Sequence, residues 1–319
     1  MSQPIETRVL HTPAEEAWRF LPEGPYRCAD GRISWVAIQH GRSATTGSLH
    51  LLTRSATATQ DQCFPLPGRP GFAFPTTDPQ RFVVGLERAV VLFNTQDGTL
   101  ETLCDGIDSS VEQTIINDGV VFDGHLVFGC KDLKFAEKKA GLYLLRRGER
   151  RAVLLDQNQI CSNGKAVVPE GDGRYTLYDI DSPSKQVLAW KLDVPAGRLS
   201  SPRVVVDMTA GPVFPDGMIL SPDGRSVIIA FYDPRDVEQG EARQYSLATG
   251  ELEQVWTCPQ SPRVTCPQLV VHDGRIELLL TTADEGMAPE LRARCPNAGC
   301  LFIGPTSFTT LNDGPAFPL

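Results

Sequence analysis

Short apolar runs separated by tight turns recur along the whole chain. The stretch 213–230 holds two such runs, Met218–Leu220 and Val227–Ala230, with Ser-Pro-Asp-Gly between them. Proline restricts the backbone φ angle and glycine accepts a positive φ, so this tetrapeptide is typical of a tight turn. The pattern therefore predicts a β-hairpin. Asp216, at the head of the first run, is either a turn former or a functional carboxylate.

The same order of elements repeats elsewhere in the chain. A polar residue and a glycine come first, followed by an apolar strand, an Asp-Gly turn and a second apolar strand. The polar positions are Glu23, Asn117, Asn163 and Asp216. The last three are about 50 residues apart and the first gap is roughly double, so one further unit lies between. A repeat of this length built from short strands is typical of β-propeller blades.

Six such units can be counted, and the sixth shows only three strands. It would gain a fourth if residues 5–10 docked beside residues 300–303, which would close the ring and remove an exposed sheet edge. No long amphipathic helix is visible, which argues against alternating βαβ order. The sequence therefore predicts an all-β fold: one six-bladed β-propeller domain over residues 1–319, with four-stranded blades closed by strands from both termini.

Two insertions interrupt this regular spacing, at residues 131–139 and 284–297. Both follow the second predicted strand of a blade. That strand ends on the side where the first strand begins, so we expect both insertions to roof the face that carries the four polar positions.

Composition and charge narrow the class of protein. The chain has 41% hydrophobic residues and a formal net charge of -9, with no basic run. These features predict a folded globular protein and argue against nucleic acid or an anionic membrane surface as a partner. The N-terminus has no apolar segment, and no apolar run approaches the ~18 residues that span a bilayer. We therefore expect a cytoplasmic location, and the sequence carries no indication of an oligomeric state.

The cysteines and histidines suggest no site of their own. Nine cysteines without a Cys-x-x-Cys pair predict reduced thiols and no zinc site. The five histidines are scattered and predict surface or turn positions: His11, His40, His50, His125 and His272. Neither a Gly-x-Ser-x-Gly elbow nor a dinucleotide-binding glycine motif occurs.

An ordered set of short motifs resembles the gluconolactonase and regucalcin (SMP-30) family of six-bladed propellers. The set is Pro22-Glu23-Gly24-Pro25, Asn117-Asp118-Gly119, Ser162-Asn163-Gly164, Asp181-Ser182-Pro183, Pro215-Asp216-Gly217-Met218 and Thr281-Thr282-Ala283. The resemblance implies a divalent metal ion on the propeller axis, held by Glu23, Asn163 and Asp216, with Asn117 contacting the substrate. In the related phosphotriesterases the residue at the place of Asn117 is itself a metal ligand.

Two positions depart from the family pattern. Family lactonases usually have an arginine where this chain has Ile115, and an apolar residue where it has Lys165. An isoleucine cannot bond the hydroxyl groups of a sugar lactone, so Ile115 favours a less polar lactone. A cation from Lys165, or from Lys131 or Lys134 in the first insertion, would instead favour an acidic substrate.

The candidate ligands predict the ion and the chemistry. Carboxylate and amide oxygens suit Ca²⁺ best, and Mg²⁺, Mn²⁺ or Zn²⁺ remain possible. Such an ion would activate a water molecule against a lactone carbonyl, with Asp216 as the general base. The sequence thus predicts a metal-dependent hydrolase of a small-molecule lactone. A phosphotriesterase of the same architecture, or a non-catalytic propeller that binds a metal ion or a metabolite, remains an alternative.

Overall fold

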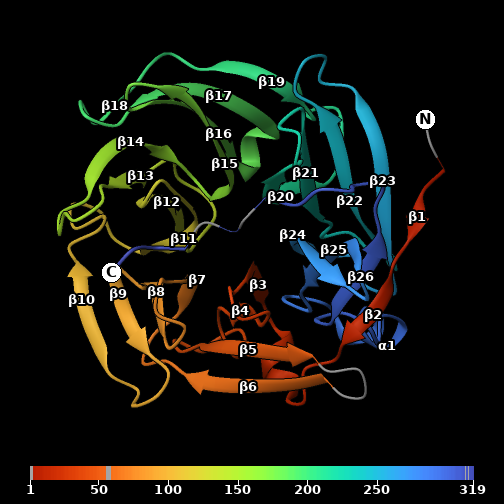
Figure 1. Ribbon diagram of the computed structural model, residues 1–319. Coiled ribbons are helices and arrows are strands. Elements are labelled where there is room, and N and C mark those ends of the chain that lie inside the picture. The colour runs from red at the N-terminus through yellow and green to blue at the C-terminus, as the bar shows by residue number, and fades with distance from the viewer. Residues whose placement is uncertain (1–2, 55–58, 313, 315) are drawn as a thin grey trace.

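The structure is a computed structural model that describes residues 3–54, 59–312, 314 and 316–319. Six sheets surround a central axis as the blades of a propeller (Figure 1). The predicted all-β, six-bladed fold is therefore confirmed.

Each blade begins with the strand nearest the axis. Blade one has β3 (Pro22–Arg27), β4 (Ile33–Ala37), β5 (Ser48–Arg54) and β6 (Thr59–Pro65). Blade two has β7 (Pro70–Pro75), β8 (Arg81–Leu86), β9 (Ala89–Asn94) and β10 (Leu100–Cys104). Blade three has β11 (Thr114–Phe122), β12 (His125–Asp132), β13 (Ala140–Leu145) and β14 (Val153–Gln159).

In the second half of the ring, some outer edges carry an extra strand. Blade four has β15 (Ser162–Gly171), β16 (Arg174–Asp181) and β17 (Gln186–Asp193), with β18 (Arg198–Leu199) and β19 (Arg203–Asp207) both paired to β17. Blade five has β20 (Phe214–Leu220), β21 (Ser226–Tyr232), β22 (Gln239–Ser246), β23 (Leu252–Pro259) and β1 (Ile5–Glu6). Blade six has β24 (Val264–His272), β25 (Arg275–Thr282), β26 (Leu301–Pro305) and β2 (Arg8–His11).

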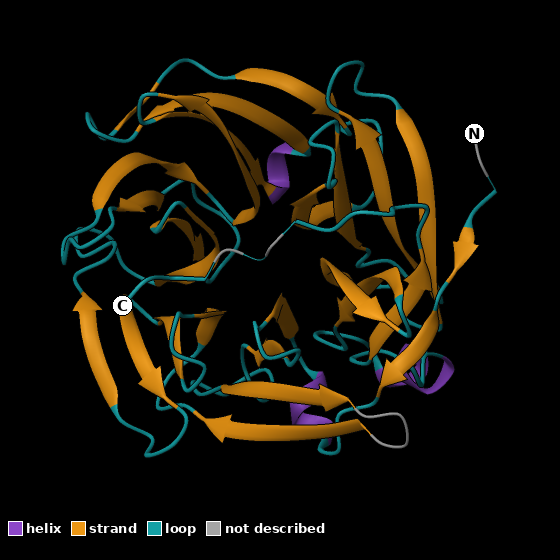
Figure 2. Cartoon of the chain, viewed as in Figure 1, coloured by secondary structure: helices purple, strands orange, loops and turns teal. Residues whose placement is uncertain are grey.

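Helices are short and few among the described residues (Figure 2). They are the 3-10 helices Glu16–Arg19 and Ser182–Ser184 and the α-helix α1 (Pro289–Arg294). No helix in this part of the chain is long and apolar enough to cross a membrane.

Tight Asp-Gly turns connect the first and second strands of several blades. Between β11 and β12, Asp123 and Gly124 have φ angles of 46° and 81°. Two consecutive positive φ angles define the hairpin turn that best matches strand twist, and Asp-Gly is a favoured sequence for it. These dipeptides therefore position the turn at the far end of the inner strand from the polar residues.

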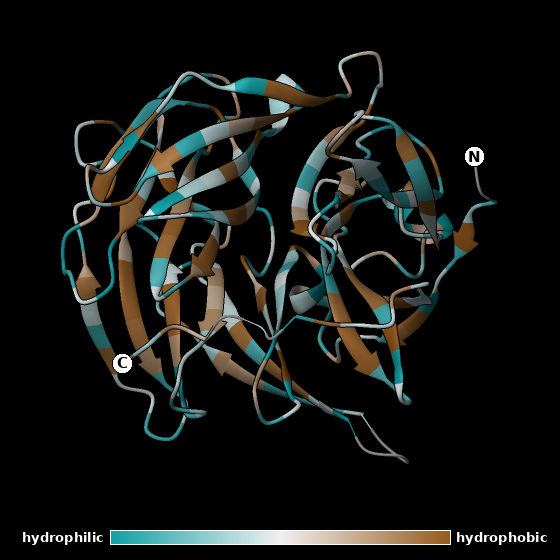
Figure 3. Ribbon diagram, turned by 45° about the horizontal axis from the view of Figure 1, so that its top comes forward, coloured by the Kyte–Doolittle hydropathy of each residue, from teal (hydrophilic) through white to brown (hydrophobic). Residues whose placement is uncertain are grey.

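The hydrophobic core lies between neighbouring blades. On β12, Leu126 and Phe128 pack with residues of blade two, whereas Val127 packs with residues of blade four. Successive side chains of a strand point to opposite faces, and here both faces are buried, so the strand reads as a continuous apolar run. Figure 3 shows hydrophobic residues concentrated in the strands. The inner edges of the blades remain available for polar residues that face the axis.

The ring is closed by the N-terminal residues, as predicted, with one refinement. β2 pairs antiparallel with β26, with Val9 opposite Phe302, and supplies the fourth strand of blade six. Residues 5 and 6 instead pair parallel with β23 in blade five. Thr7 divides the two strands, and its hydroxyl donates to the carbonyl oxygen of Thr257 at 2.8 Å. The predicted single strand over residues 5–10 is thus split between two blades.

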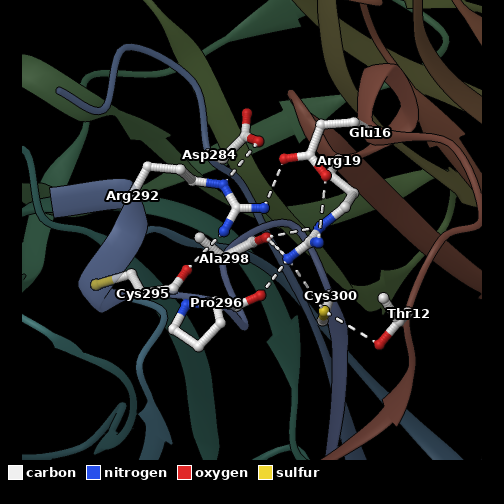
Figure 4. Close-up of polar contacts among 9 residues, drawn as sticks. All are labelled: Thr12, Glu16, Arg19, Asp284, Arg292, Cys295, Pro296, Ala298 and Cys300. Carbon is white, nitrogen blue, oxygen red and sulfur yellow. Dashed lines mark hydrogen bonds and ion pairs between the residues drawn. The ribbon is translucent and has the colours of Figure 1, made fainter. Parts of the chain in front are cut away.

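The insertion at 284–297 lies mainly at the edge of the propeller, where α1 is seen beside β2 in Figure 1. Figure 4 shows the polar contacts that hold it there. Arg19 donates from Nε to the carbonyl oxygen of Ala298 at 3.0 Å, and Arg292 donates to Glu16 at 2.6 Å and Asp284 at 3.3 Å. The insertion thus begins on the predicted face, where Asp284 and Glu285 bond to the residues just before β3, but most of it packs at the edge and does not extend over the axis.

Three of the five histidines form one network. His50 is fully buried, so the prediction of a surface or turn position is wrong for it, whereas His11 and His40 are half-buried. His11 and His50 each place a ring nitrogen 3.1 Å from Oδ2 of Asp61. Ser48 Oγ lies 2.8 Å from Nε2 of His50 and 2.8 Å from Nε2 of His40. Ser48 and His50 are both 0% exposed, so this serine cannot attack a substrate as a hydrolase triad would. The network instead joins β2 to blade one.

This network predicts an acid-dependent loss of stability. Burial of Asp61 opposes ionisation, but hydrogen bonds from His11 and His50 outweigh burial and hold the pKa of Asp61 at about 2, below its ordinary 3.8. A depressed carboxyl pKa stabilises the folded state above pH 4, and that stabilisation is lost as the pH falls toward 2. We expect wild type to lose about 2 kcal/mol more than Asp61→Asn over this range in urea unfolding. Parallel pH profiles for the two proteins would contradict the assignment.

Candidate functional site

The polar positions of four blades meet in one cavity at the start of the inner strands. Glu23 on β3, Asn117 on β11, Asn163 on β15 and Asp216 on β20 all line this cavity, which has a volume of about 660 Å³. Because the four strands come from blades one, three, four and five, only ring closure brings these side chains together.

A chain of hydrogen bonds orients the two amides. Asn117 donates from Nδ2 to Oδ1 of Asn163 at 2.8 Å, and Asn163 donates from Nδ2 to Oγ of Ser182 at 2.8 Å. Ser182 in turn donates to the carbonyl oxygen of Pro215 at 2.7 Å. Both amide nitrogens are therefore engaged as donors. Oδ1 of Asn117 accepts no hydrogen bond from the described residues, and Oδ1 of Asn163 keeps one lone pair, so both oxygens can face a ligand.

The two carboxylates of the cavity, one buried and one half-buried, have few partners. Asp216 is 8% exposed and accepts no hydrogen bond from any other residue that the structure describes, while Glu23 accepts one from the backbone of Gly24 at 3.0 Å. Burial, and then the charge of Asp118, raises the pKa of Glu23 well above its usual range. Burial, and then the charge of Glu23, does the same for Asp216. The folded protein thus holds two carboxylates whose ionised forms are compensated only in part.

These residues fit a hard divalent cation. Two carboxylates and two amides supply only oxygen ligands, as Ca²⁺ and similar ions prefer. Within the described ranges no three His, Cys, Asp or Glu side chains gather into a metal site, so the set depends on both asparagines. The ammonium of Lys131 borders the same cavity, and its charge lowers the pKa of both Glu23 and Asp216.

Apolar side chains form the outer wall of the cavity. Leu133 and Phe135, from the loop after β12, are 42% and 46% exposed and line the cavity with Phe214 and Tyr232. The ring of Phe135 meets that of Phe214 edge to face, with centroids 6.0 Å apart. This apolar lip is defined by Leu133, Phe135, Phe214 and Tyr232. The insertion at 131–139 therefore lies over the polar residues, as predicted.

Two predicted substrate-binding residues lie elsewhere. Ile115 pairs with Lys131 across β11 and β12 but is 2% exposed and is not among the residues of the cavity wall. Lys165 is also buried, because its ammonium lies 3.3 Å from Asp179 and donates to the carbonyl oxygen of Asn163 at 2.7 Å. It borders a different cavity. Neither residue is placed to contact a substrate held between Glu23 and Asp216.

Sequence reasoning missed several residues of the wall. The loop that follows β4 contributes Arg42–Thr45, and Cys161 and Ser182 lie beside the asparagines. The position of this loop could have been predicted from the sequence. It follows the second strand of blade one, just as the insertion at 131–139 follows the second strand of blade three. Ser182 also stood in one of the family motifs, Asp181-Ser182-Pro183, without an assigned role.

Comparison with known proteins identifies the family. The sequence model described as the SMP-30/Gluconolactonase/LRE-like region matches residues 21–284, which is most of the chain. The chain belongs to this family. Lactonases are among the members of the SMP-30/gluconolactonase family, which supports a lactonase-type hydrolase in general terms.

Individual relatives share limited identity with this family member. The Bacillus subtilis protein YvrE, named for a proposed sugar lactone lactonase activity, is 25% identical over 221 residues, covering 69% of this chain and 71% of YvrE. Regucalcin of Danio rerio is 30% identical over 128 residues, covering 40% of each protein.

Solved structures match the fold over nearly the full length. Regucalcin from Agrobacterium tumefaciens, described as a calcium-binding protein, superposes with a TM-score of 0.79 at 22% identity, covering 99% of this chain and 98% of that one. A luciferin-regenerating enzyme gives a TM-score of 0.76 at 19% identity, with 94% and 95% covered. At these identities the matches establish a shared propeller fold.

Proposed function

We propose that this protein is a metal-dependent hydrolase that opens a lactone less polar than a sugar lactone. The observation that carries the proposal is the pair Glu23 and Asp216: one half-buried and one buried carboxylate with few partners, facing a cavity beside two oriented amides. Glu23, Asn163 and Asp216 would hold the ion, with Asn117 beside them. A divalent ion at this position supplies Lewis acidity, which polarises a carbonyl group and lowers the pKa of water.

The residues of this chain have separate roles in the reaction. One carboxylate oxygen of Asp216 takes a proton from the attacking water, whose oxygen forms the new bond to the lactone carbonyl carbon. The ring C–O bond then breaks, and the proton passes to the departing alkoxide, giving a hydroxy acid. Lys131 borders the cavity and offers a positive charge to the oxyanion and then to the new carboxylate. Ser182 acts indirectly, because it orients Asn163.

The apolar lip argues for the substrate class. Hydroxyl groups of a sugar lactone that faced Leu133, Phe135 and Phe214 would lose water and gain no hydrogen bond from these three side chains. An alkyl or aryl substituent would instead bury apolar surface there. The preference for a less polar lactone, first argued from Ile115, therefore rests on these residues instead.

The test is hydrolysis of a lactone panel by the purified protein before and after chelation. We expect alkyl- and aryl-substituted lactones to be hydrolysed with higher kcat/KM than gluconolactone, and calcium to restore the activity that EDTA removes. An organophosphate triester in the panel tests the phosphotriesterase alternative. Metal binding without turnover of any member would favour the non-catalytic propeller.

A single substitution tests the role of the lip. Phe135→Ala should raise KM for an aryl-substituted lactone about tenfold, because a buried aromatic contact is lost, and should leave KM for unsubstituted butyrolactone nearly unchanged. Steady-state kinetics on both substrates make this comparison, with the small lactone as the internal control. An equal change for both substrates would show that Phe135 does not contact the substituent.

A further inference from the structure

A second cavity lies on the axis at the opposite end of the inner strands. Its volume is about 520 Å³, all six inner strands contribute to its wall, and it shares no lining residue with the first cavity. The wall is largely aromatic and aliphatic, with Phe74, Phe122, Val167, Ile219 and Leu269 among its residues. An apolar cavity of this size suits a small organic molecule.

Three residues beyond β26 belong to the wall of this cavity: Leu311, Asn312 and Gly314. Asn312 donates from Nδ2 to the carbonyl oxygen of Pro222 at 3.2 Å. The backbone nitrogen of Phe317 donates to the carbonyl oxygen of Pro75 at 3.0 Å. These two contacts hold Asn312 beside blade five and Phe317 beside blade two.

The cavity wall includes one carboxylate without a cationic contact. Asp118 accepts a hydrogen bond from the backbone nitrogen of Gly119 at 2.7 Å, and no other described residue forms a hydrogen bond or ion pair with it. Lys165 itself contacts Asp179 at 3.3 Å, so its charge is already balanced. Ionised Asp118 therefore lacks a partner of its own.

The remaining polar groups of this cavity do not supply that partner. Arg27 donates to the carbonyl oxygen of Asn312, and Asp123 accepts from the hydroxyl of Tyr175 at 2.9 Å, so these two opposite charges are engaged with neighbours. Two aromatic rings lie on the same wall: the centroids of Tyr26 and Phe74 are 4.1 Å apart. Aromatic faces beside a carboxylate attract an organic cation.

We propose that this second cavity binds a small organic amine, with its ammonium group paired to Asp118 and its apolar body against the aromatic and aliphatic wall. An ammonium would supply the missing countercharge and hydrogen-bond donors, while the apolar body would replace water along Phe74, Ile219 and Leu269. The proposal does not depend on lactone hydrolysis, because the two cavities have separate walls.

The experiment compares 2-phenylethylamine with its neutral analogue 2-phenylethanol by titration followed in methyl NMR spectra. The buffer contains saturating calcium, which occupies the carboxylates of the first cavity. We expect the amine to shift the methyl signals of Val167, Ile219 and Leu269. Its affinity should be at least about tenfold higher than that of the alcohol, because a charge-assisted hydrogen bond contributes that much. Asp118→Asn should remove this difference.

Two further variants make the result decisive. Asp123→Asn removes a carboxylate of the same cavity that already has a partner, so the preference for the amine should persist. Val167→Trp fills the cavity and should weaken binding of both compounds at least about tenfold. Equal affinity for amine and alcohol in wild type, or shifts confined to Leu21 and Leu133 at the first cavity, would overturn the proposal. If Asp118→Asn fails to fold, the wild-type comparison and Val167→Trp decide it.

Discussion

Asp216→Asn should abolish calcium binding at the axial site and lower kcat/KM for lactone hydrolysis by about 10³-fold. The substitution keeps the size of the side chain but removes the charge that holds a cation and the oxygen that accepts a proton, and loss of a general base alone costs 10²–10⁴-fold. Calorimetric titration with calcium and steady-state kinetics measure the two effects separately. Full calcium affinity in the variant would exclude Asp216 as a ligand.

When calcium is absent, Asp216→Asn should stabilise the folded protein. Because the folded protein raises the pKa of Asp216, first through burial, its contribution to stability is present at low pH and is lost as pH rises above the ordinary value of 3.8. In EDTA at pH 7, Asp216→Asn should therefore unfold at a higher temperature than wild type, and calcium should reverse that order. Asp233→Asn is the matched control, since Asp233 pairs with Arg235 and does not line the cavity.

Lys165→Met should produce the largest loss of stability, about 3–5 kcal/mol in urea unfolding. Its ammonium and the carboxylate of Asp179 are 0% and 2% exposed and lie 3.3 Å apart, so removal of the cation leaves a buried charge uncompensated. The double variant Lys165→Met/Asp179→Asn should recover most of the loss, because the asparagine oxygen can still accept the hydrogen bond from Gln159.

An exposed ion pair provides the control for this prediction. Lys191 pairs with Glu170 on the same blade, but the lysine side chain is 65% exposed. Exposed pairs contribute little, so Lys191→Met should cost under about 1 kcal/mol. If the Lys165 and Lys191 variants lost equal stability, burial of the Lys165–Asp179 pair would not be the cause.

Local patterns in the sequence determined the architecture. Apolar runs and Asp-Gly turns specify hairpins by themselves, because strand alternation and turn conformation depend on residues close in the chain. The spacing of these hairpins then predicted six blades, and the missing fourth strand of the last blade predicted closure by the N-terminus. Glu23, Asn117, Asn163 and Asp216 could be proposed because each occupies the same place in its own repeat.

Only the tertiary structure decided which neighbours these residues meet. Ile115 and Lys165 are near Asn117 and Asn163 in sequence, yet Ile115 is buried beside β12 and Lys165 turns to Asp179. The pairing register shifts between Ile116 and Gly119 and again between Asn163 and Lys165, so simple strand alternation does not predict where these side chains point. The pairing of His11 and His50 with Asp61 joins residues up to 50 positions apart. Such contacts depend on how separate strands pack, and packing is set by the closed ring as a whole rather than by any local pattern.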